Sequence, residues 1–311
     1  MDNPFKYSNT NLRYHSLSYY FKNKYGGKVS KIALDADFTC PNRDGKAGFG
    51  GCSFCSSAGS GEFAGDSNKT IMTQYNNVKA RMQNKWPDSK TVPYFQAYTS
   101  TYGPLSKIKE MVEPFLLMDE VVAIDIATRP DCLEDDVIEY LDSLTGCKDI
   151  WIELGLQTIH DQIARDFNRG YDFDVFVDTV KRLAKTKIKV CVHLINGLPN
   201  ESMEMMVESA KVVSSMDIDA VKIHMLHLVK DSRLGQQYLK KPFKILSKDE
   251  YVDIVASQLE VIPKEIIIQR LTGDAKAENL IVPKWTLSKF IVMNDIQKEL
   301  VKRDSYQGRL A

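Results

Sequence analysis

The chain lacks several features that would narrow its function at once. It carries no net charge, because 41 Lys and Arg residues balance 41 Asp and Glu residues, and this balance neither supports nor excludes a nucleic-acid partner. No apolar run is long enough to span a membrane, and the opening residues 1–4 are not typical of a signal peptide. Repeats and low-complexity segments are also missing. We therefore expect a cytoplasmic protein with no membrane partner.

Cysteine is scarce and unevenly spread. Of the six cysteines, Cys40, Cys52 and Cys55 cluster, whereas the other three are scattered along the chain. Disulfides do not persist in a reducing cytoplasm, so a cysteine cluster there indicates metal binding or catalysis.

Short runs rich in Val and Ile alternate with helical patterns. The runs that predict strands are 31–36, 94–97, 121–126, 150–154, 189–195 and 220–226, with a weaker one at 265–270. Between them, helices are predicted at 71–85, 105–117, 133–144, 159–167, 174–184, 202–215 and 248–259. This alternation predicts an α/β fold built as a partial (β/α)6 TIM-like barrel, with functional residues at the carboxyl ends of the strands.

The two ends of the chain are predicted to extend this barrel. We expect an N-terminal extension over 1–30, the barrel over 31–245, and a C-terminal extension over 246–311 with a long amphipathic helix at 283–303. The first segment mixes aromatic and basic residues, a composition that suits RNA binding. It equally suits a helix packed on the barrel through Leu12, Leu17 and Phe21.

The cysteine cluster has the spacing C-x11-C-x2-C. Gly48, Gly50 and Gly51 allow the long first gap to fold back, so that Cys40 can join the close pair. Three thiolates suit a 4Fe–4S cluster with one iron left open, where the amino and carboxylate groups of S-adenosylmethionine (SAM) can chelate. A zinc ion with a distant fourth ligand, or simply buried thiols, is the alternative.

Several short motifs accompany this cluster, and most of them lie at the end of a predicted strand. They are Phe54 before the last cysteine, and the segments 94–101, 128–133, 153–157, 193–200, 222–227 and 306–308. In this order the motifs resemble the radical SAM superfamily, and within it the YtqA/YhcC (MnmL-type) family. More distantly they resemble the catalytic subunit of Elongator and the oxygen-independent coproporphyrinogen oxidases. The resemblance implies a 4Fe–4S cluster on Cys40, Cys52 and Cys55 and SAM beside it.

The resemblance also implies which residues contact SAM. These are Gln96, Tyr98, Ser100, Glu153, Gln157, His193 and Gly197. For Glu153 the sequence also supports a role without the resemblance, because a carboxylate within the apolar run 150–154 must be paired or functional. For Gln96 and Tyr98 the alternative is a polar strand end, and for His193 it is a satisfied core histidine.

Candidate catalytic residues follow other strands. Lys222 and His224 alternate with apolar neighbours, so both face one side of the predicted strand, where they suit an anionic group or proton transfer. Arg129 follows the third strand and can hold a carboxylate in bidentate fashion. Solvated positions are the alternative for Lys222 and His224, whereas in the segment of Arg129 the neighbouring Asp131 can simply cap the next helix.

The family resemblance implies modification of the wobble uridine of tRNA, from the 5-carboxymethylaminomethyl form to the 5-aminomethyl form. It also implies an electron donor such as flavodoxin or ferredoxin. Two other functions remain open at this point. One is radical chemistry on a small molecule or peptide, and the other is a non-enzymatic zinc-binding barrel module.

Overall fold

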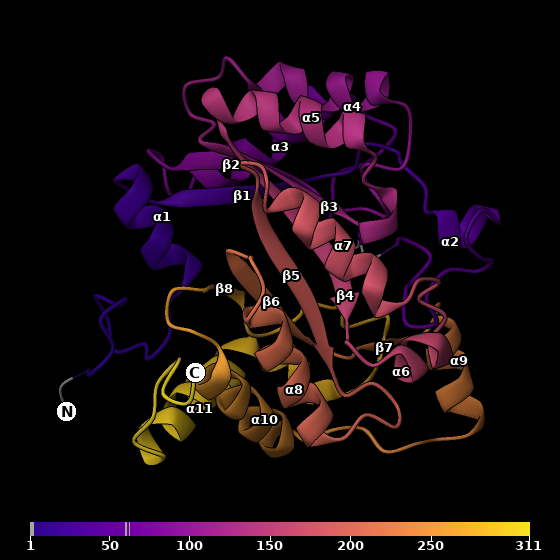
Figure 1. Ribbon diagram of the computed structural model, residues 1–311, viewed down its shortest axis with the longest axis vertical. Helices are drawn as coiled ribbons and strands as arrows, with labels where there is room; N and C mark the ends of the chain where they lie inside the picture. Colours follow the sequence, from indigo (N-terminus) through magenta and orange to yellow (C-terminus); the bar gives the residue numbers. More distant parts are fainter. Residues whose placement is uncertain (1–2, 60, 62) are drawn as a thin grey trace.

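A single parallel sheet organises the computed structural model, which describes residues 3–59, 61 and 63–311 (Figure 1). Its order is β1-β2-β3-β4-β5-β6-β8, and every neighbouring pair is parallel. The strands are β1 (Val29–Leu34), β2 (Lys90–Phe95), β3 (Ala123–Thr128), β4 (Asp149–Gln157), β5 (Lys189–Asn196), β6 (Ala220–Met225) and β8 (Ile267–Arg270). This curled, open sheet confirms the predicted partial barrel, including its weak last strand.

Helices connect the strands and cover the outer face of the sheet (Figure 1). They are α3 (Ile71–Gln83), α4 (Leu105–Val112), α5 (Asp135–Ser143), α6 (Asp161–Asp166), α7 (Phe173–Leu183), α8 (Met203–Ser214) and α10 (Lys248–Val261). Short 3-10 helices occupy Glu113–Phe115, Pro130–Cys132, Leu144–Gly146 and Lys284–Ser288. Alternate strand residues such as Ile152 and Leu154 pack outward against these helices, which leaves Glu153 between them to face inward.

The N-terminal helix α1 (Leu17–Tyr25) covers the inner face of the sheet at the end where the strands begin. Its buried Phe21 belongs to one hydrophobic cluster with a residue from each of the seven strands of the large sheet, among them Val92 and Trp151. The alternative of a helix packed on the barrel is therefore confirmed, with Leu17 only partly buried. Because helix α1 fills this end, the open space inside the curled sheet lies at the carboxyl ends of the strands.

The last residues of the chain fasten the N-terminal segment to the edge of the sheet. The Gln307 side chain accepts a hydrogen bond from His15 N (2.8 Å) and donates to the carbonyls of Pro263 and Ile266 (2.7 and 2.8 Å). His15 O in turn accepts from Ile268 N in β8 (2.7 Å). The 306–308 motif thus has a structural role.

Some elements were not predicted. They are the short α2 (Pro41–Asp44), α9 (Arg233–Lys240) and the antiparallel pair β7 (Leu228–Val229) and β9 (Leu280–Val282). Most are too short to show a hydrophobic period. The predicted C-terminal helix begins later, as α11 (Lys289–Lys302), because a 3-10 helix follows Pro283. The predicted division into 1–30, 31–245 and 246–311 stays a prediction. In the described part of the chain, no helix has the length and apolarity needed to cross a membrane.

Candidate functional site

A cavity of about 730 Å³ opens at the carboxyl ends of the strands, and residues from all strands of the large sheet line it. Eleven of the thirteen predicted site residues line this one cavity: Cys40, Cys52, Cys55, Gln96, Tyr98, Arg129, Glu153, Gln157, His193, Lys222 and His224. Ser100 and Gly197 are not among the lining residues. The strands therefore bring together residues that are spread over most of the sequence.

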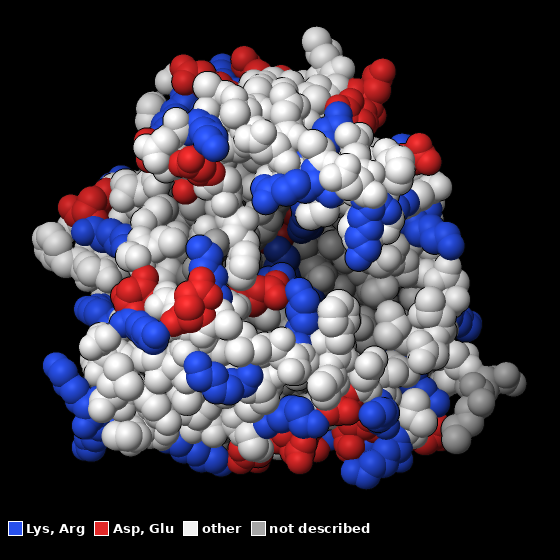
Figure 2. Space-filling view, turned by 180° about the vertical axis from the view of Figure 1, so that it is seen from behind, with Lys and Arg blue, Asp and Glu red and all other residues white. Residues whose placement is uncertain are grey.

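The cavity is cationic although the chain is neutral. Its lining contains the Lys and Arg residues Lys31, Arg43, Arg129, Arg169, Lys222, Arg270, Lys276 and Lys289. Only two carboxylates, Glu153 and Asp274, line it among the described residues. Figure 2 shows a hollow on this side of the molecule with Lys and Arg side chains around it. Such a lining favours an anionic ligand.

The three clustered thiols meet at one end of this cavity. Cys40 precedes α2, whereas Cys52 and Cys55 sit on a tight turn in which Cys55 N donates to Cys52 O (3.1 Å). A hydrogen bond from Cys55, with smaller contributions from Arg129 and Asn42, lowers the pKa of Cys52 to about 7 against the effect of burial. A thiol held close to its thiolate form suits metal ligation.

Residues 51–57 carry Cys52 and Cys55, and we call them the cysteine loop. Distant segments of the chain hold this loop in place. Ser53 N donates to Phe167 O (2.8 Å), and Leu234 N donates to Ser53 O (2.7 Å). Asn168 and Arg233 side chains both donate to Gly51 O, at 2.8 and 2.7 Å.

Asp231 adds a clamp to the same loop. Its carboxylate accepts from the backbone and hydroxyl of Ser57 (3.0 and 2.6 Å) and from Asn279 Nδ2 (2.7 Å). Burial opposes ionisation, but these hydrogen bonds lower the pKa of Asp231 to about 2. The clamp joins the cysteine loop to the segment before β9.

The thiols fit a cluster better than a single zinc ion. Among the described residues, one group of His, Cys, Asp and Glu side chains has all its ligand atoms within 4.8 Å of one another. None of Cys40, Cys52 and Cys55 belongs to that group. A tetrahedral zinc site needs four such ligands in close contact. In a cubane each thiolate binds a different iron atom, so its ligands stand farther apart.

A buried ion network forms the floor of the cavity. Glu153 is fully buried, accepts from Lys31 Nζ (2.8 Å) and His193 Nε2 (2.7 Å), and is also paired with Lys222. Burial alone would raise its pKa, but the charges of the two lysines hold the pKa of Glu153 well below its usual range. Glu153 is therefore paired, as its position in an apolar run predicts.

Two members of this network were missed by sequence reasoning. Lys31 pairs with Asp125 as well as Glu153, and its Nζ donates to Gln269 Oε1 (2.6 Å). Burial and the charge of Glu153 raise the pKa of Asp125 to about 7, and its Oδ1 atom has no hydrogen-bond partner. Asp125 lies between Ile124 and Ile126, which is the same signal that marked Glu153.

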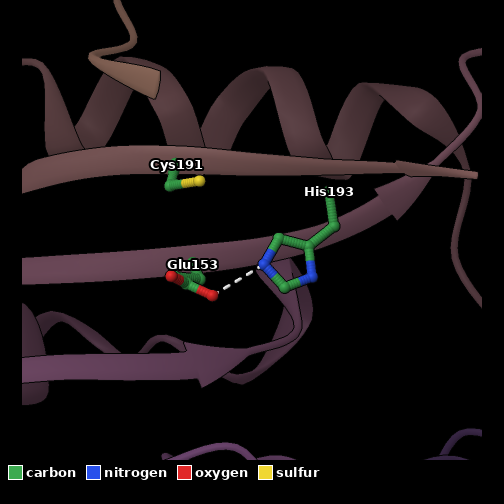
Figure 3. Close-up of side chains that lie close together, drawn as sticks. All are labelled: Glu153, Cys191 and His193. Carbon is green, nitrogen blue, oxygen red and sulfur yellow. Dashed lines mark hydrogen bonds and ion pairs between the residues drawn. The ribbon is translucent and has the colours of Figure 1, made fainter. Parts of the chain in front are cut away.

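Cys191 joins Glu153 and His193 in a compact group (Figure 3). Their ligand atoms lie within 4.8 Å of one another, which is suitable spacing for a metal ion. However, the ammonium groups of Lys31 and Lys222 already neutralise Glu153, and burial raises the pKa of the Cys191 thiol well above its usual value. We assign this group to the ion network and not to a metal.

Two neutral histidines face the other end of the cavity. His224 and His227 line it, and each has a buried Nε2 atom without a hydrogen-bond partner. Burial, with the neighbouring His193 and Arg270, lowers the pKa of His224 well below its usual value, and burial lowers the pKa of His227 to about 4. Unpaired polar atoms at a cavity wall are positioned for a ligand.

The residues predicted to contact SAM differ in their availability. Tyr98 has a φ of 55°, its N–H donates to Gly59 O (3.1 Å), and its hydroxyl donates to Ser57 O. Gln157 has a φ of 70° and an unpaired, buried Oε1 atom. Ser100 is buried, with its N–H donating to Ala127 O (3.1 Å). Gly197 has a φ of 93°, which its lack of a side chain permits.

Arg129 has little freedom to bind a ligand. Its Nε and Nη2 atoms donate to the Asp131 carboxylate at 2.8 and 2.7 Å, and Nη1 donates to Arg169 O (2.7 Å). The bidentate pairing expected of this arginine is present, but within the chain.

Comparison with known proteins supplies the family. A model described as the Radical SAM superfamily matches residues 43–213, and a model of the Radical_SAM C-terminal domain matches residues 218–302. The chain is 49% identical to the uncharacterized protein YtqA of Bacillus subtilis over 99% of this chain and 96% of that protein. It is 33% identical to protein YhcC of Escherichia coli over 89% of each.

More distant similarities include one protein named for action on tRNA and two solved structures. The chain is 26% identical to the tRNA uridine(34) acetyltransferase of Methanocaldococcus jannaschii over 62% of this chain and 35% of that protein. Its fold is similar to that of Methanocaldococcus infernus Elp3 with an N-terminal deletion, with a TM-score of 0.65 at 18% identity, covering 90% of this chain and 64% of that one. It is also similar in fold to methylornithine synthase, with a TM-score of 0.52 at 12% identity, covering 94% and 87%.

Proposed function

The chain belongs to the radical SAM superfamily, and on that premise we propose that it removes the carboxymethyl arm from 5-carboxymethylaminomethyl uridine at the wobble position of tRNA. The product is 5-aminomethyl uridine. The observation that carries this proposal is one cationic cavity that joins the clustered thiols to unpaired polar groups. The relative named for tRNA uridine(34) supports the choice of substrate class.

The enzyme's cofactors are a 4Fe–4S cluster and SAM. Cys40, Cys52 and Cys55 would hold the cluster. When bound, these groups would supply a 5′-deoxyadenosyl radical, which is able to remove a hydrogen atom from the substrate. Gln96, Tyr98 and Gln157 line the cavity and are the available predicted contacts for SAM.

The ion network has a positioning role in this proposal. Glu153 pairs with Lys222 on the floor of the cavity and accepts from His193, so we assign Glu153 and His193 a positioning role in place of the SAM contacts predicted for them. Ser100 and Gly197 shape the backbone behind the cavity wall. Arg129 positions the cavity wall through Asp131, in place of the substrate contact predicted for it.

The substrate would occupy the end formed by β6 and β8. Lys222 and Arg270 are cations suited to the carboxylate of the arm. His224 and His227 offer neutral imidazoles to the polar edge of the uracil ring. A base inside this cavity must leave the anticodon stack, as other enzymes that act on bases require.

A hydrogen atom leaves the methylene carbon of the carboxymethyl arm for the 5′-deoxyadenosyl group. The substrate radical then loses one electron to a one-electron acceptor of the iron–sulfur class, which gives an iminium. Water hydrolyses the iminium, releasing glyoxylate and leaving the primary amine on the uridine.

Nucleoside analysis tests the proposal. Reconstituted enzyme is incubated anaerobically with SAM, a reductant and tRNA that carries the carboxymethylaminomethyl group. We expect 5-aminomethyl uridine and glyoxylate to form in equal amounts. The Cys52→Ala variant should form neither, and the Cys147→Ala variant, which alters an exposed cysteine away from the cavity, should form both. SAM cleavage without any change in the nucleosides would direct the search to small molecules or peptides.

A further inference from the structure

The residues between Cys40 and Cys52 form a small projecting loop, which we call the 40–52 loop. It contains α2 and a tight turn in which Gly45 N donates to Gly48 O (3.1 Å), with an antiparallel bridge between Asp44 and Phe49. In Figure 1, α2 stands out from the body of the molecule. The loop therefore offers an outward surface next to two of the cluster thiols.

Phe49 is exposed on this loop yet fixed in position. Its side chain is 76% exposed. The ring lies across Gly45, where a Cβ atom would come within 2.7 Å of Cε1 and Cζ, and the Phe49 carbonyl accepts from Asn168 Nδ2 (3.2 Å). Phe49 does not line the cavity. A held, exposed aromatic ring is a typical anchor for a protein partner.

The surroundings of Phe49 are mainly cationic. Lys46 is exposed on the same turn, and exposed Arg233 lies against Gly50 and donates to Gly51 O (2.7 Å). Arg43 of α2 donates to the carbonyl of Ser56. Asp44 is the one acidic residue within the 40–52 loop. The surface thus complements an acidic partner.

We propose that the 40–52 loop docks an acidic one-electron carrier protein that reduces the cluster. In this step the carrier is oxidised by one electron and the bound cluster is reduced by one. The proposal rests on the radical SAM family and is independent of the RNA substrate. An electron carrier has to approach the thiols without blocking the cavity. Lys46 and Phe49 lie between Cys40 and Cys52 in the loop and do not line the cavity, so a carrier docked on these two residues meets both conditions.

RNA is a second anionic partner that a surface with cationic and aromatic side chains attracts. The position of the loop argues against it, because the target base must enter the cavity and neither Lys46 nor Phe49 lines it. The cations that line the cavity, Lys276 and Lys289 among them, serve the RNA better.

Binding to a bacterial flavodoxin provides the first test. The dissociation constant of flavodoxin is measured for the cluster-loaded enzyme and for its Phe49→Ala and Lys46→Glu variants. We expect each change to weaken binding about tenfold, equivalent to about 1.4 kcal/mol. Phe290→Ala is the matched control, because Phe290 is 73% exposed on α11, and its affinity should equal that of the unaltered chain. Unchanged affinity in both loop variants would overturn the proposal.

The reductant provides the second test. SAM cleavage without RNA is followed with flavodoxin reduced by its reductase, and in parallel with dithionite, which needs no docking surface. The loop variants should lose about tenfold with flavodoxin at limiting concentration and nothing with dithionite. Equal losses with both reductants would show that the loop only shapes the cluster site. Weaker tRNA binding with normal flavodoxin turnover would assign the loop to RNA.

Discussion

The Nε2 atom of His193 lies 2.7 Å from Oε2 of Glu153, and this contact joins β5 to β4 on the floor of the cavity (Figure 3). The same carboxylate is paired with Lys31 and Lys222, which come from β1 and β6. One buried anion therefore fixes cations from strands far apart in the sheet. This arrangement leaves a cationic cavity beside the clustered thiols, and such a cavity suits an anionic substrate.

Replacing Glu153 should destabilise the chain. The Glu153→Gln change leaves the buried Lys222 and the partly buried Lys31 with Asp125 as the remaining carboxylate of the network. We expect a loss of about 3–5 kcal/mol in the free energy of unfolding, because a buried charge loses its partner. Urea denaturation of the cluster-free chain measures it. Glu208→Gln, at an exposed position on α8, should change stability by less than about 1 kcal/mol. An equally small effect at Glu153 would show that the lysines are not held by it.

Glu201 should make the stability depend on pH. Burial raises its pKa from 4.5 to about 8, and its Oε2 atom is buried without a hydrogen-bond partner. Between pH 4.5 and 8 the folded state then keeps a proton that the unfolded state loses, so stability falls as pH rises, by at most about 1.4 kcal/mol per pH unit.

The Glu201→Gln variant tests this slope. It cannot ionise, so its stability relative to the unaltered chain should increase from pH 5 to pH 8 and then level off. Denaturant midpoints of the cluster-free chain at several pH values measure the difference, with Glu208→Gln as the exposed control on α8. A difference that is constant over this range would contradict a raised pKa.

Asp231 should help the chain retain its cluster. The Asp231→Ala change removes the acceptor for Ser57 and Asn279, so the cysteine loop loses its clamp. We expect a severalfold loss of iron after desalting, with little change in the unfolding midpoint. Asp249→Ala, whose side chain is 92% exposed, is the matched control. Full iron retention in the Asp231 variant would mean that the other contacts to the loop suffice.

A methyl group at Gly273 should disturb the substrate end of the cavity. A Cβ atom there would lie 2.5 Å from Cε1 of His227, so the ring must move. We expect Gly273→Ala to raise the KM for tRNA about tenfold, or about 1.4 kcal/mol, and to leave RNA-independent SAM cleavage unchanged. Gly146→Ala, at a position with open space, is the control. A loss of RNA-independent cleavage would place His227 near SAM instead.

The sequence predicted the barrel because its strands and helices have clear hydrophobic periods. It predicted the thiols because their spacing is local, and the cavity now joins them to Lys222 and His224. Glu153 was marked by its apolar neighbours, and the same reasoning applied to Asp125 would have found a second member of the ion network.

Long-range contacts explain what the sequence could not predict. Asn168 contacts Gly51 across 117 positions, and Asp231 contacts Ser57 across 174. Neither residue has a local pattern that distinguishes it from a surface side chain. The carboxylate partner of Arg129 is only two positions away, but nothing in the sequence shows that Asp131 accepts from both Nε and Nη2 while Nη1 donates to Arg169 O.

The most direct test of the central claim is SAM cleavage by the chain reconstituted anaerobically with iron and sulfide. The 5′-deoxyadenosine formed is measured with and without bulk tRNA, for the unaltered chain, Cys52→Ala and Cys147→Ala. We predict iron with matching sulfide, and cleavage that requires Cys52, tolerates loss of Cys147 and increases with tRNA. Zinc without sulfide and no cleavage would contradict the account, and cleavage indifferent to tRNA would contradict its assignment of the substrate.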